Sequence, residues 1–223
     1  MSDRNYYEAY DERYKTAHEA GIRWFGDAAS PIVSEIISRY QITKESKILE
    51  LGCGEGRDAQ ALLENGYQVL ATDISPEVIG YCKKLMPKYA DSFGVLDCVK
   101  DSLTEKFDFI YAVAVVHMLV LDEDRNAFYR FVNRHLMPDG IALICTMGDG
   151  NTEMQSDIHT AFDLQKREHE GKEIAVAGTS CRMVTDATFQ EELSRNGFKV
   201  LEYGQTCIPG QFSEMMYAVV KRA

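Results

Sequence analysis

The sequence predicts an α/β fold in which helices cover both faces of a mostly parallel sheet. Its clearest sign lies between Lys47 and Ser75, where a strand, a glycine-rich turn, a helix and a second strand follow one another. Two further segments, Ser75 to Leu85 and Asp122 to Leu136, have the pattern of crossover helices. The 223 residues, 45% of them apolar, can bury a sizeable core. We therefore expect one domain over residues 1–223.

Two helices are expected ahead of this core, from Asn5 to Phe25 and from Ser30 to Tyr40, so that residues 1–44 form a helical cap. Ser30 suits the N-cap of the second helix and Pro31 its first position. An aromatic stripe at helical spacing, followed by the single tryptophan, occupies the first: Tyr6, Tyr7, Tyr10, Tyr14 and Trp24. Ordinary packing of an amphipathic helix is an alternative explanation of this stripe.

The glycine-rich turn follows the strand Lys47 to Leu51 and has glycine at every second position, at Gly52, Gly54 and Gly56. Backbone without side chains can approach a ligand closely. The first amides of the helix that follows, from about Arg57 to Asn65, favour a negative group. The turn is therefore a candidate ligand site.

The second strand, Gln68 to Thr72, delivers Asp73, whose carboxylate can accept both hydroxyls of a ribose. An adenosine-containing cofactor is implied. A dinucleotide site has its third glycine where Arg57 stands. Here that glycine falls one residue earlier, which gives acid-x-G-x-G-x-G from Glu50 to Gly56. This pattern resembles motif one of the class I S-adenosylmethionine (SAM) dependent methyltransferases.

The resemblance covers roughly residues 45–150 and implies a Rossmann-like, seven-stranded, mostly parallel sheet with an antiparallel C-terminal strand. It implies a SAM-binding core over residues 45–148, followed by a C-terminal helix and strands over residues 185–223. Within the superfamily, the chain looks most like the small-molecule branch that includes tellurite-resistance and thiopurine methyltransferase relatives. The elements expected on these grounds are a third strand before Asp97, a fourth strand and turn from Phe107 to Leu119, a loop and fifth strand from Leu136 to Gly150, a helix from Asp186 to Arg195, and closing strands from Phe198 to Tyr203 and Met215 to Lys221.

An insertion, Asp149 to Val184, follows the fifth strand. Ligands usually bind at the carboxyl ends of parallel strands, so we interpret the insertion as a cover that selects the substrate. We expect part of it, from about Asp157 to His169, to be helical. A dimer contact or a mobile loop are the alternatives.

The resemblance assigns cofactor-binding positions along the core. Gly52, Cys53 and Gly54 should pass the methionine moiety of SAM, with Arg57 or Asp58 near its carboxylate and amino end. Further candidates are Asp73 for the ribose, Ile74 against the adenine, Asp97 with Cys98 at the adenine edge, and Val113 with Ala114 along the methionine segment. Asp101 is an alternative to Asp97, and no polar residue occupies the end of the fourth strand.

Candidates that face the substrate come from the cap, the fourth strand and the insertion. They are Tyr10, Tyr14, Trp24, His117, Asp149 and His159. In related enzymes the N-terminal helix covers the cofactor, which makes the aromatic stripe a candidate lid. His117 is the best candidate for a general base, although a structural histidine that binds a loop carbonyl fits the sequence equally well.

Composition narrows the partners and the compartment. A net charge of −11 and a pI near 4.9 argue against a long nucleic-acid footprint, which needs clustered lysine and arginine, and favour a small-molecule substrate. Solubility alone would also explain this charge. The six cysteines form no C-x-x-C pair, so no metal or disulfide framework is expected. With no apolar leader and no membrane-spanning stretch, we expect a cytoplasmic protein.

The expected reaction is in-line methyl transfer from SAM to a small-molecule acceptor. Such a transfer depends mainly on alignment, and a base is needed only for hydroxyl or carbon acceptors. An NAD-dependent oxidoreductase and a non-catalytic SAM-binding module are the alternatives. The sequence identifies neither the acceptor atom nor the oligomeric state.

Overall fold

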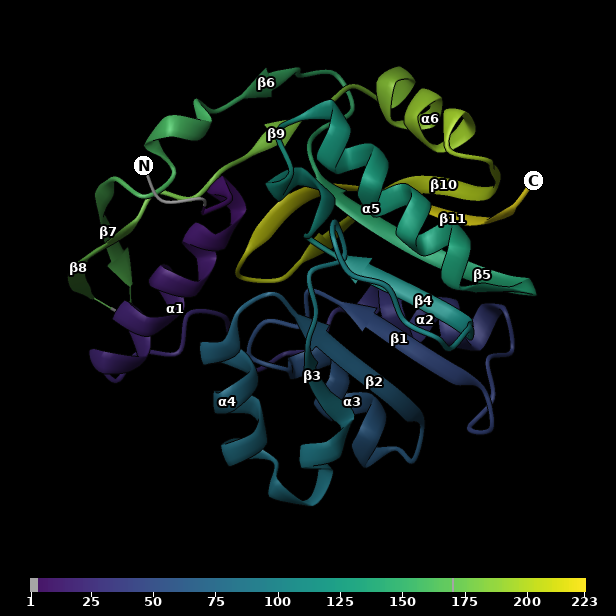
Figure 1. Ribbon diagram of the computed structural model, residues 1–223, viewed down its shortest axis with the longest axis horizontal. Coiled ribbons are helices and arrows are strands. Elements are labelled where there is room, and N and C mark those ends of the chain that lie inside the picture. The colour runs from purple at the N-terminus through teal and green to yellow at the C-terminus, as the bar shows by residue number, and fades with distance from the viewer. Residues whose placement is uncertain (1–3, 170) are drawn as a thin grey trace.

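A seven-stranded sheet forms the centre of the computed structural model, which describes residues 4–169 and 171–223 (Figure 1). Its strand order is β10-β11-β5-β4-β1-β2-β3. The strands are β1 (Lys47–Leu51), β2 (Gln68–Asp73), β3 (Phe93–Val95), β4 (Phe107–Val113), β5 (Leu136–Met147), β10 (Phe198–Ile208) and β11 (Phe212–Arg222). Strand β11 runs antiparallel to both β5 and β10, and the other pairs are parallel. The predicted fold class is confirmed.

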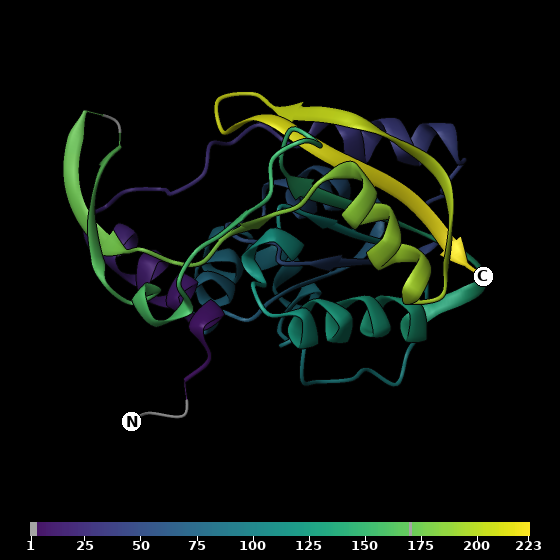
Figure 2. The ribbon, with the colours of Figure 1, turned by 90° about the horizontal axis from the view of Figure 1, so that it is seen from above.

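Helices cover both faces of this sheet (Figures 1 and 2). The α-helices are α1 (Ala9–Glu19), α2 (Pro31–Arg39), α3 (Arg57–Glu64), α4 (Pro76–Leu85), α5 (Asp122–His135) and α6 (Asp186–Arg195). The 3-10 turns are η1 (Tyr6–Glu8), η2 (Pro87–Ser92), η3 (Val116–Met118) and η4 (Ile158–Thr160). Helices α5 and α6 pack on one face, and α2, α3 and α4 pack on the other. The predicted crossover helices are therefore present.

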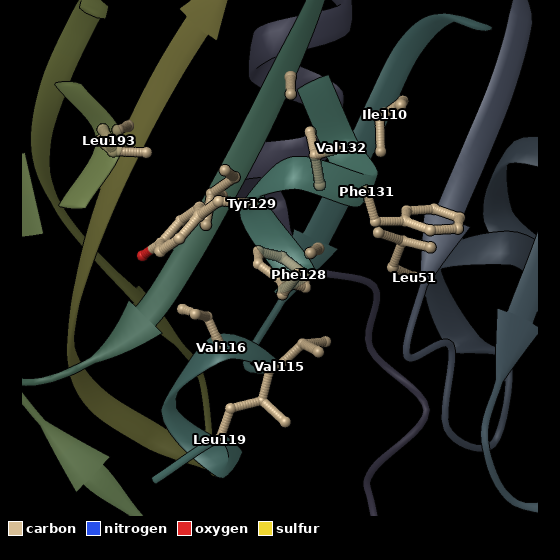
Figure 3. Close-up of a cluster of buried hydrophobic side chains, with 14 of the residues drawn as sticks. Leu51, Ile110, Val115, Val116, Leu119, Phe128, Tyr129, Phe131, Val132 and Leu193 are labelled. Carbon is tan, nitrogen blue, oxygen red and sulfur yellow. The ribbon is translucent and has the colours of Figure 1, made fainter. Parts of the chain in front are cut away.

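Each face of the sheet has its own apolar core, because successive strand residues point to opposite sides. In β1, Ile48 contacts the cluster under α2 and α3, whereas Leu49 and Leu51 belong to the cluster under α5. Figure 3 shows α5 laying Phe128 and other aromatic side chains onto that second cluster. Burial of these faces fixes the register of the strands, and with it the edge at which β1, β2 and β4 end.

The expected first helix, Asn5 to Phe25, is shorter than predicted. Helix α1 ends at Glu19, and Gly21 follows with a φ of 69°. The peptide N–H groups of Trp24 and Phe25 donate to the Glu55 carboxylate instead of to helical carbonyls. A tertiary hydrogen-bond partner thus replaces the last turn that the sequence pattern suggested.

The helix predicted from Asp157 to His169 is wrong. Only the short turn η4 is helical, and β7 (Leu164–His169) then pairs antiparallel with β8 (Lys172–Ala177). A second small pair joins β6 (Met154–Gln155) to β9 (Arg182–Met183). The residues of β7 are mostly good helix formers, which hid the alternation of side chains that indicates a strand. Gly171 has the left-handed conformation in the turn between the two strands. The insertion spans Glu170, which lies outside the described residues.

The hairpin of β7 and β8 packs beside α1, away from the sheet (Figure 2). Arg13 of α1 holds the end of β8, because its Nε and Nη2 atoms donate to the carbonyl of Ala177 at 3.1 and 2.8 Å. Helix α1 and the insertion, far apart in the sequence, therefore pack against each other.

Candidate functional site

A cavity opens at the carboxyl ends of β1, β2 and β4, under α1. It encloses about 990 Å³ of space that no atom fills, its open mouth included. We call it the first cavity. All eleven residues predicted for the cofactor line it: Gly52, Cys53, Gly54, Arg57, Asp58, Asp73, Ile74, Asp97, Cys98, Val113 and Ala114.

Glycines form the floor of this cavity because a side chain at Gly52 or Gly54 would crowd its neighbours. Gly52 has a φ of 68°, and a Cβ there would lie 2.4 Å from Cγ2 of Val115. Gly54 has a φ of 52°, and its N–H donates to Oδ2 of Asp73 at 2.9 Å. Both positions need the left-handed conformation that glycine adopts at little cost. The turn thus presents bare backbone to a ligand.

Asp73 joins the turn to the end of β2. Its Oδ1 accepts the N–H of Ser75 at 2.9 Å, while Oδ2 accepts that of Gly54. Burial raises the pKa of Asp73 above that of a free aspartate, and the two backbone N–H groups offset part of this rise. An ionised carboxylate can accept about four hydrogen bonds, so both oxygens retain acceptor capacity toward the cavity.

Asp97 lines the same cavity just after β3, next to the end of β2, where the N–H of Leu96 donates to the carbonyl of Asp73 at 2.9 Å. Its Oδ2 accepts the Tyr7 hydroxyl at 3.2 Å, and its Oδ1 accepts the N–H of Val99 at 2.9 Å. Asp101, the alternative in the sequence, does not line the cavity, and its Oδ2 instead accepts the N–H of Asp97. The structure therefore favours Asp97 over Asp101. Tyr7 was not predicted, although it belongs to the tyrosine stripe.

Asp58 and Arg57 lie at the first turn of α3. Both carboxylate oxygens of Asp58 are taken by Ser30, whose N–H and hydroxyl donate at 2.5 and 2.8 Å. Ser30 is at the N-cap position of α2, as predicted, but its side chain binds Asp58 of α3 and not a backbone N–H of its own helix. The Arg57 guanidinium donates to the Gln211 side chain and lies 5.7 Å from the centre of the Phe25 ring. Nη2 of Arg57 also faces the Ser30 hydroxyl at 3.4 Å, and its Nε lies 4.0 Å from Oδ1 of Asp58, so both side chains already have partners within the protein.

Glu55 fastens the cap over the glycine turn. Besides the N–H groups of Trp24 and Phe25, at 2.8 and 2.7 Å, its carboxylate contacts Nε2 of His18 at 3.0 Å. This residue was not among those predicted for the site. The sequence did offer one indication of its role. Glu55 is an acidic residue between Gly54 and Gly56, at a position where the glycine motif accepts any residue.

A second cavity adjoins the first. Tyr10, Phe25, Met118 and Phe212 line both, so these side chains form the junction between them. Trp24 and His117, predicted to face the substrate, line the second cavity, whereas Tyr14 lines the first. Residues that were not predicted also line the second cavity. They come from α1, the hairpin and the segment after it: Arg13, Gln165, Arg167, His169, Thr179, Ser180 and Cys181.

Two predicted substrate residues lie outside both cavities. Asp149 closes its own loop, because its side chain accepts from the N–H groups of Asn151 and Thr152 and from the Thr152 hydroxyl. His159 is exposed on η4. The insertion therefore contributes β7 and the segment after β8 to the second cavity, rather than these two side chains.

His117 is buried in the wall of the second cavity. Burial, with a smaller effect of the Arg125 charge, lowers its pKa to about 3. Its Nδ1 has no hydrogen-bond partner within the described chain, and Phe212 packs edge-on against its ring at 5.9 Å. A base is most effective when its pKa lies near the working pH, so His117 is poorly suited to remove a proton near neutrality.

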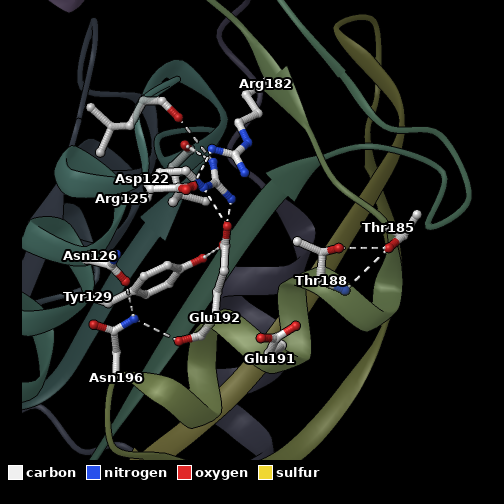
Figure 4. A network of polar contacts seen from close by, with 12 residues as sticks. Asp122, Arg125, Asn126, Tyr129, Arg182, Thr185, Thr188, Glu191, Glu192 and Asn196 are labelled. Atoms are coloured by element: carbon white, nitrogen blue, oxygen red, sulfur yellow. Dashed lines mark hydrogen bonds and ion pairs between the residues drawn. The ribbon is translucent and has the colours of Figure 1, made fainter.

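A buried ion pair supports the turn η3, which carries His117 and Met118 (Figure 4). Nε and Nη2 of Arg125, on α5, donate to the two carboxylate oxygens of Glu192, on α6, at 2.7 Å each. The third nitrogen, Nη1, donates to the carbonyls of Val116 and Leu119. The wall shared by the two cavities is thus held by helices on the far side of η3.

This fold, with a glycine turn and an acid at the end of β2, is that of a class I SAM-dependent methyltransferase. Residues 49–142 match the profile of a family described as "methyltransferase domain". This match confirms the resemblance to that superfamily. In 142 residues it is 30% identical to a malonyl-[acyl-carrier protein] O-methyltransferase of Bacillus anthracis, with 63% of this chain and 51% of the relative covered. The chain thus spans about half the length of that curated relative.

Solved structures show the same fold at lower identity. A 1,6-didemethyltoxoflavin-N1-methyltransferase of Burkholderia thailandensis superposes with a TM-score of 0.71 at 16% identity, over 100% of this chain and 92% of that one. A TehB-like SAM-dependent methyltransferase of Corynebacterium glutamicum gives 0.59 at 22% identity, over 97% of each chain. Placement in the tellurite-resistance branch remains a prediction.

The described residues lack two features, a membrane-spanning helix and a metal-binding cluster. Over residues 4–169 and 171–223, no helix combines the length and apolar character needed to cross a membrane. Over the same residues, no cluster of three or more histidine, cysteine or acidic side chains is arranged to hold a metal ion.

Proposed function

We propose that this protein transfers the methyl group of SAM to a small-molecule acceptor. The observation that carries this proposal is the pair of adjoining cavities. The first has the residues expected for the cofactor, and the second opens from it past Tyr10, Phe25, Met118 and Phe212. A methyl donor and an acceptor held in these cavities would meet at that junction.

The residues of the first cavity fit SAM. The acceptor capacity of Asp73 suits two ribose hydroxyls, and Ile74 offers an apolar surface for the adenine beside Asp97 and Cys98. The Arg57 guanidinium can pair with the amino-acid carboxylate. Gly52, Cys53 and Gly54 would pass the methionine backbone, along with Val113 and Ala114.

When bound, SAM supplies a methyl group activated by the sulfonium. The protein's task is then to align the acceptor and exclude water, which contributes on the order of 7–11 kcal/mol for well-oriented reactants. The junction side chains, three of which are aromatic, form the water-excluding wall. Because His117 has a strongly lowered pKa, we infer an acceptor that needs no general base from this histidine.

We propose further that the protein acts in the cytoplasm as a single domain, with residues 1–44 and 149–184 as covers over a core of residues 45–148 and a C-terminal part of residues 185–223. All six cysteines are free, including the exposed Cys207, which supports a reducing compartment. The charge of −11 supports a small-molecule substrate over a nucleic acid.

Calorimetric titration with S-adenosylhomocysteine, with NADH as the control, tests this function. We expect micromolar binding of S-adenosylhomocysteine and none of NADH. Binding of NADH alone would support an oxidoreductase instead, and absence of both would show that the glycine turn serves another purpose.

A further inference from the structure

The second cavity has an unusual charge for this acidic protein. Although the chain has a net charge of −11, the lining contains two arginines, Arg13 and Arg167, and within the described residues no aspartate or glutamate. Uncompensated cationic groups around a cavity attract an anion. The lining thus differs sharply in charge from the surface around it.

Arg13 is the most informative residue of this lining, because its charged side chain is buried: it is only 8% exposed. Its hydrogen bonds in the described chain all go to backbone carbonyls, those of Ala177 and Gly178. It lies 5.3 Å from the ring centre of Tyr10 and 4.9 Å from that of Trp24. A buried guanidinium without a carboxylate partner is costly, so it normally has an anion beside it.

Arg167 adds a second positive charge from β7. Gln165, Arg167 and His169 alternate along this strand and all line the cavity, whereas Lys166 pairs with Glu173 at 2.7 Å. Burial lowers the pKa of Arg13, and the nearby charge of Arg167 lowers it further. The two guanidinium groups therefore repel each other, and a bound anion would relieve that repulsion.

His169 completes this cluster. Its Nε2 donates to the carbonyl of Trp24 at 2.9 Å, and its ring packs 5.4 Å from the Trp24 ring. The buried Nδ1 has no partner in the described part of the chain. This buried nitrogen is therefore open to a hydrogen bond with a bound ligand.

On the basis of the proposed function, we propose that the methyl acceptor carries an oxyanion, as a carboxylate or a phosphate monoester, which Arg13 and Arg167 bind at the α1 end of the second cavity. Bidentate pairing with guanidinium groups suits both anions. Tyr10 links this end to the junction, because it contacts Arg13 and is itself one of the junction side chains. The anion is thus an anchor that directs the rest of the acceptor toward the cofactor.

The single tryptophan makes this proposal testable, because Trp24 lies in the cavity wall against Arg13. The full chain, saturated with S-adenosylhomocysteine, is titrated with benzoate, phenyl phosphate and the neutral benzamide while tryptophan fluorescence is followed. We expect at least one anion to bind about tenfold or more tighter than benzamide. The preferred anion distinguishes a carboxylate from a phosphate.

Arg167→Gln is the test variant, because the side chain is exposed and its loss should not disturb the fold. We expect it to lower anion affinity about tenfold and to leave benzamide binding unchanged. Lys166→Gln removes the same charge from the neighbouring residue and should have little effect. A second variant, Arg13→Lys, keeps the charge but loses the two guanidinium nitrogens that donate to the carbonyl of Ala177. It should also weaken anion binding.

The outcomes separate the two proposals. Normal binding of S-adenosylhomocysteine, with anions no tighter than benzamide or with equal effects of Arg167→Gln and Lys166→Gln, overturns the anion site but leaves the proposed function intact. Failure to bind S-adenosylhomocysteine overturns the proposed function itself.

Discussion

The two cavities are built in different ways. Most of the first cavity is lined by short segments that each follow a strand of the parallel sheet, such as Gly52 to Gly54 after β1 and Asp73 to Ile74 at the end of β2, and α1 adds a smaller part. The second is enclosed by α1, the β7–β8 hairpin and the loop between β10 and β11. One cavity is therefore a property of the sheet edge, whereas the other depends on how covers pack over that edge.

This difference has a functional meaning. A parallel sheet places the ends of its strands together whatever the loops contain, so the first cavity can persist while the covers change. The segments around the second cavity supply Arg13 and Arg167. Under the proposed function, changes in these segments would alter the acceptor and leave the cofactor unchanged. We expect perturbations to fall into three groups, which affect both cavities, the first, or the second.

The largest expected effect comes from the wall shared by both cavities. Glu192→Gln removes the partner of Arg125 and leaves a buried charge uncompensated, which should lower the free energy of unfolding by about 3–5 kcal/mol. Denaturant titration measures this loss. Loosening of η3 should also weaken ligand binding in both cavities.

Glu191→Gln is the matched control, because Glu191 is exposed on the same helix and pairs with Arg195 at 3.5 Å. Such a surface pair contributes at most about 0.5 kcal/mol. Similar losses for the two variants would contradict a supporting role for the buried pair.

A change at Asp73 should affect the first cavity. Asp73→Ala removes the proposed ribose acceptor and leaves the N–H groups of Gly54 and Ser75 without their partner. Each hydrogen bond to a charged group contributes about 1.5–3 kcal/mol, so the affinity for S-adenosylhomocysteine should fall at least about a hundredfold.

Calorimetry measures this loss, with Asp91→Ala, an exposed acid on η2, as the control. Asp73→Asn preserves an acceptor for the turn and should still bind poorly. Wild-type affinity in both Asp73 variants would show that this carboxylate only holds the turn.

The sequence predicted the sheet and the first cavity because their signals are local. Gly52 and Asp73 lie within one strand–helix–strand unit, where each residue type has a direct physical reason. The hairpin could not be predicted in this way. The residues of β7 favour helix when isolated, and their strand conformation follows from pairing with β8 and packing against α1.

The positive charge of the second cavity also could not be predicted from the sequence. Arg13 and Arg167 are 154 positions apart, and nothing in the order of residues indicates that both line one cavity. Glu55 illustrates an intermediate case. Its position inside the glycine turn was visible, but the backbone groups that it binds, those of Trp24 and Phe25, lie in a loop that the sequence suggested was helical.

The smallest expected effect concerns His117 and the second cavity. Its pKa in the folded protein is lowered from 6.5 to about 3, so the folded state binds fewer protons than the unfolded chain between these values. The stability that the neutral ring contributes is therefore fully present above pH 6.5 and is lost as the pH falls toward 3. The slope for one such group is about 1.4 kcal/mol per pH unit, or about 2 kcal/mol between pH 6.5 and 5.

His117→Leu removes this titrating group from the buried wall. The variant should lose about 2 kcal/mol less than the wild type between pH 6.5 and 5, whatever its absolute stability. Denaturant titrations at both pH values measure the difference, and His159→Gln, at an exposed histidine, should retain the wild-type dependence. Identical losses in wild type and His117→Leu would mean that His117 takes up a proton without cost. It would then be a possible general base, and the choice of acceptors in the second cavity would extend to hydroxyl groups.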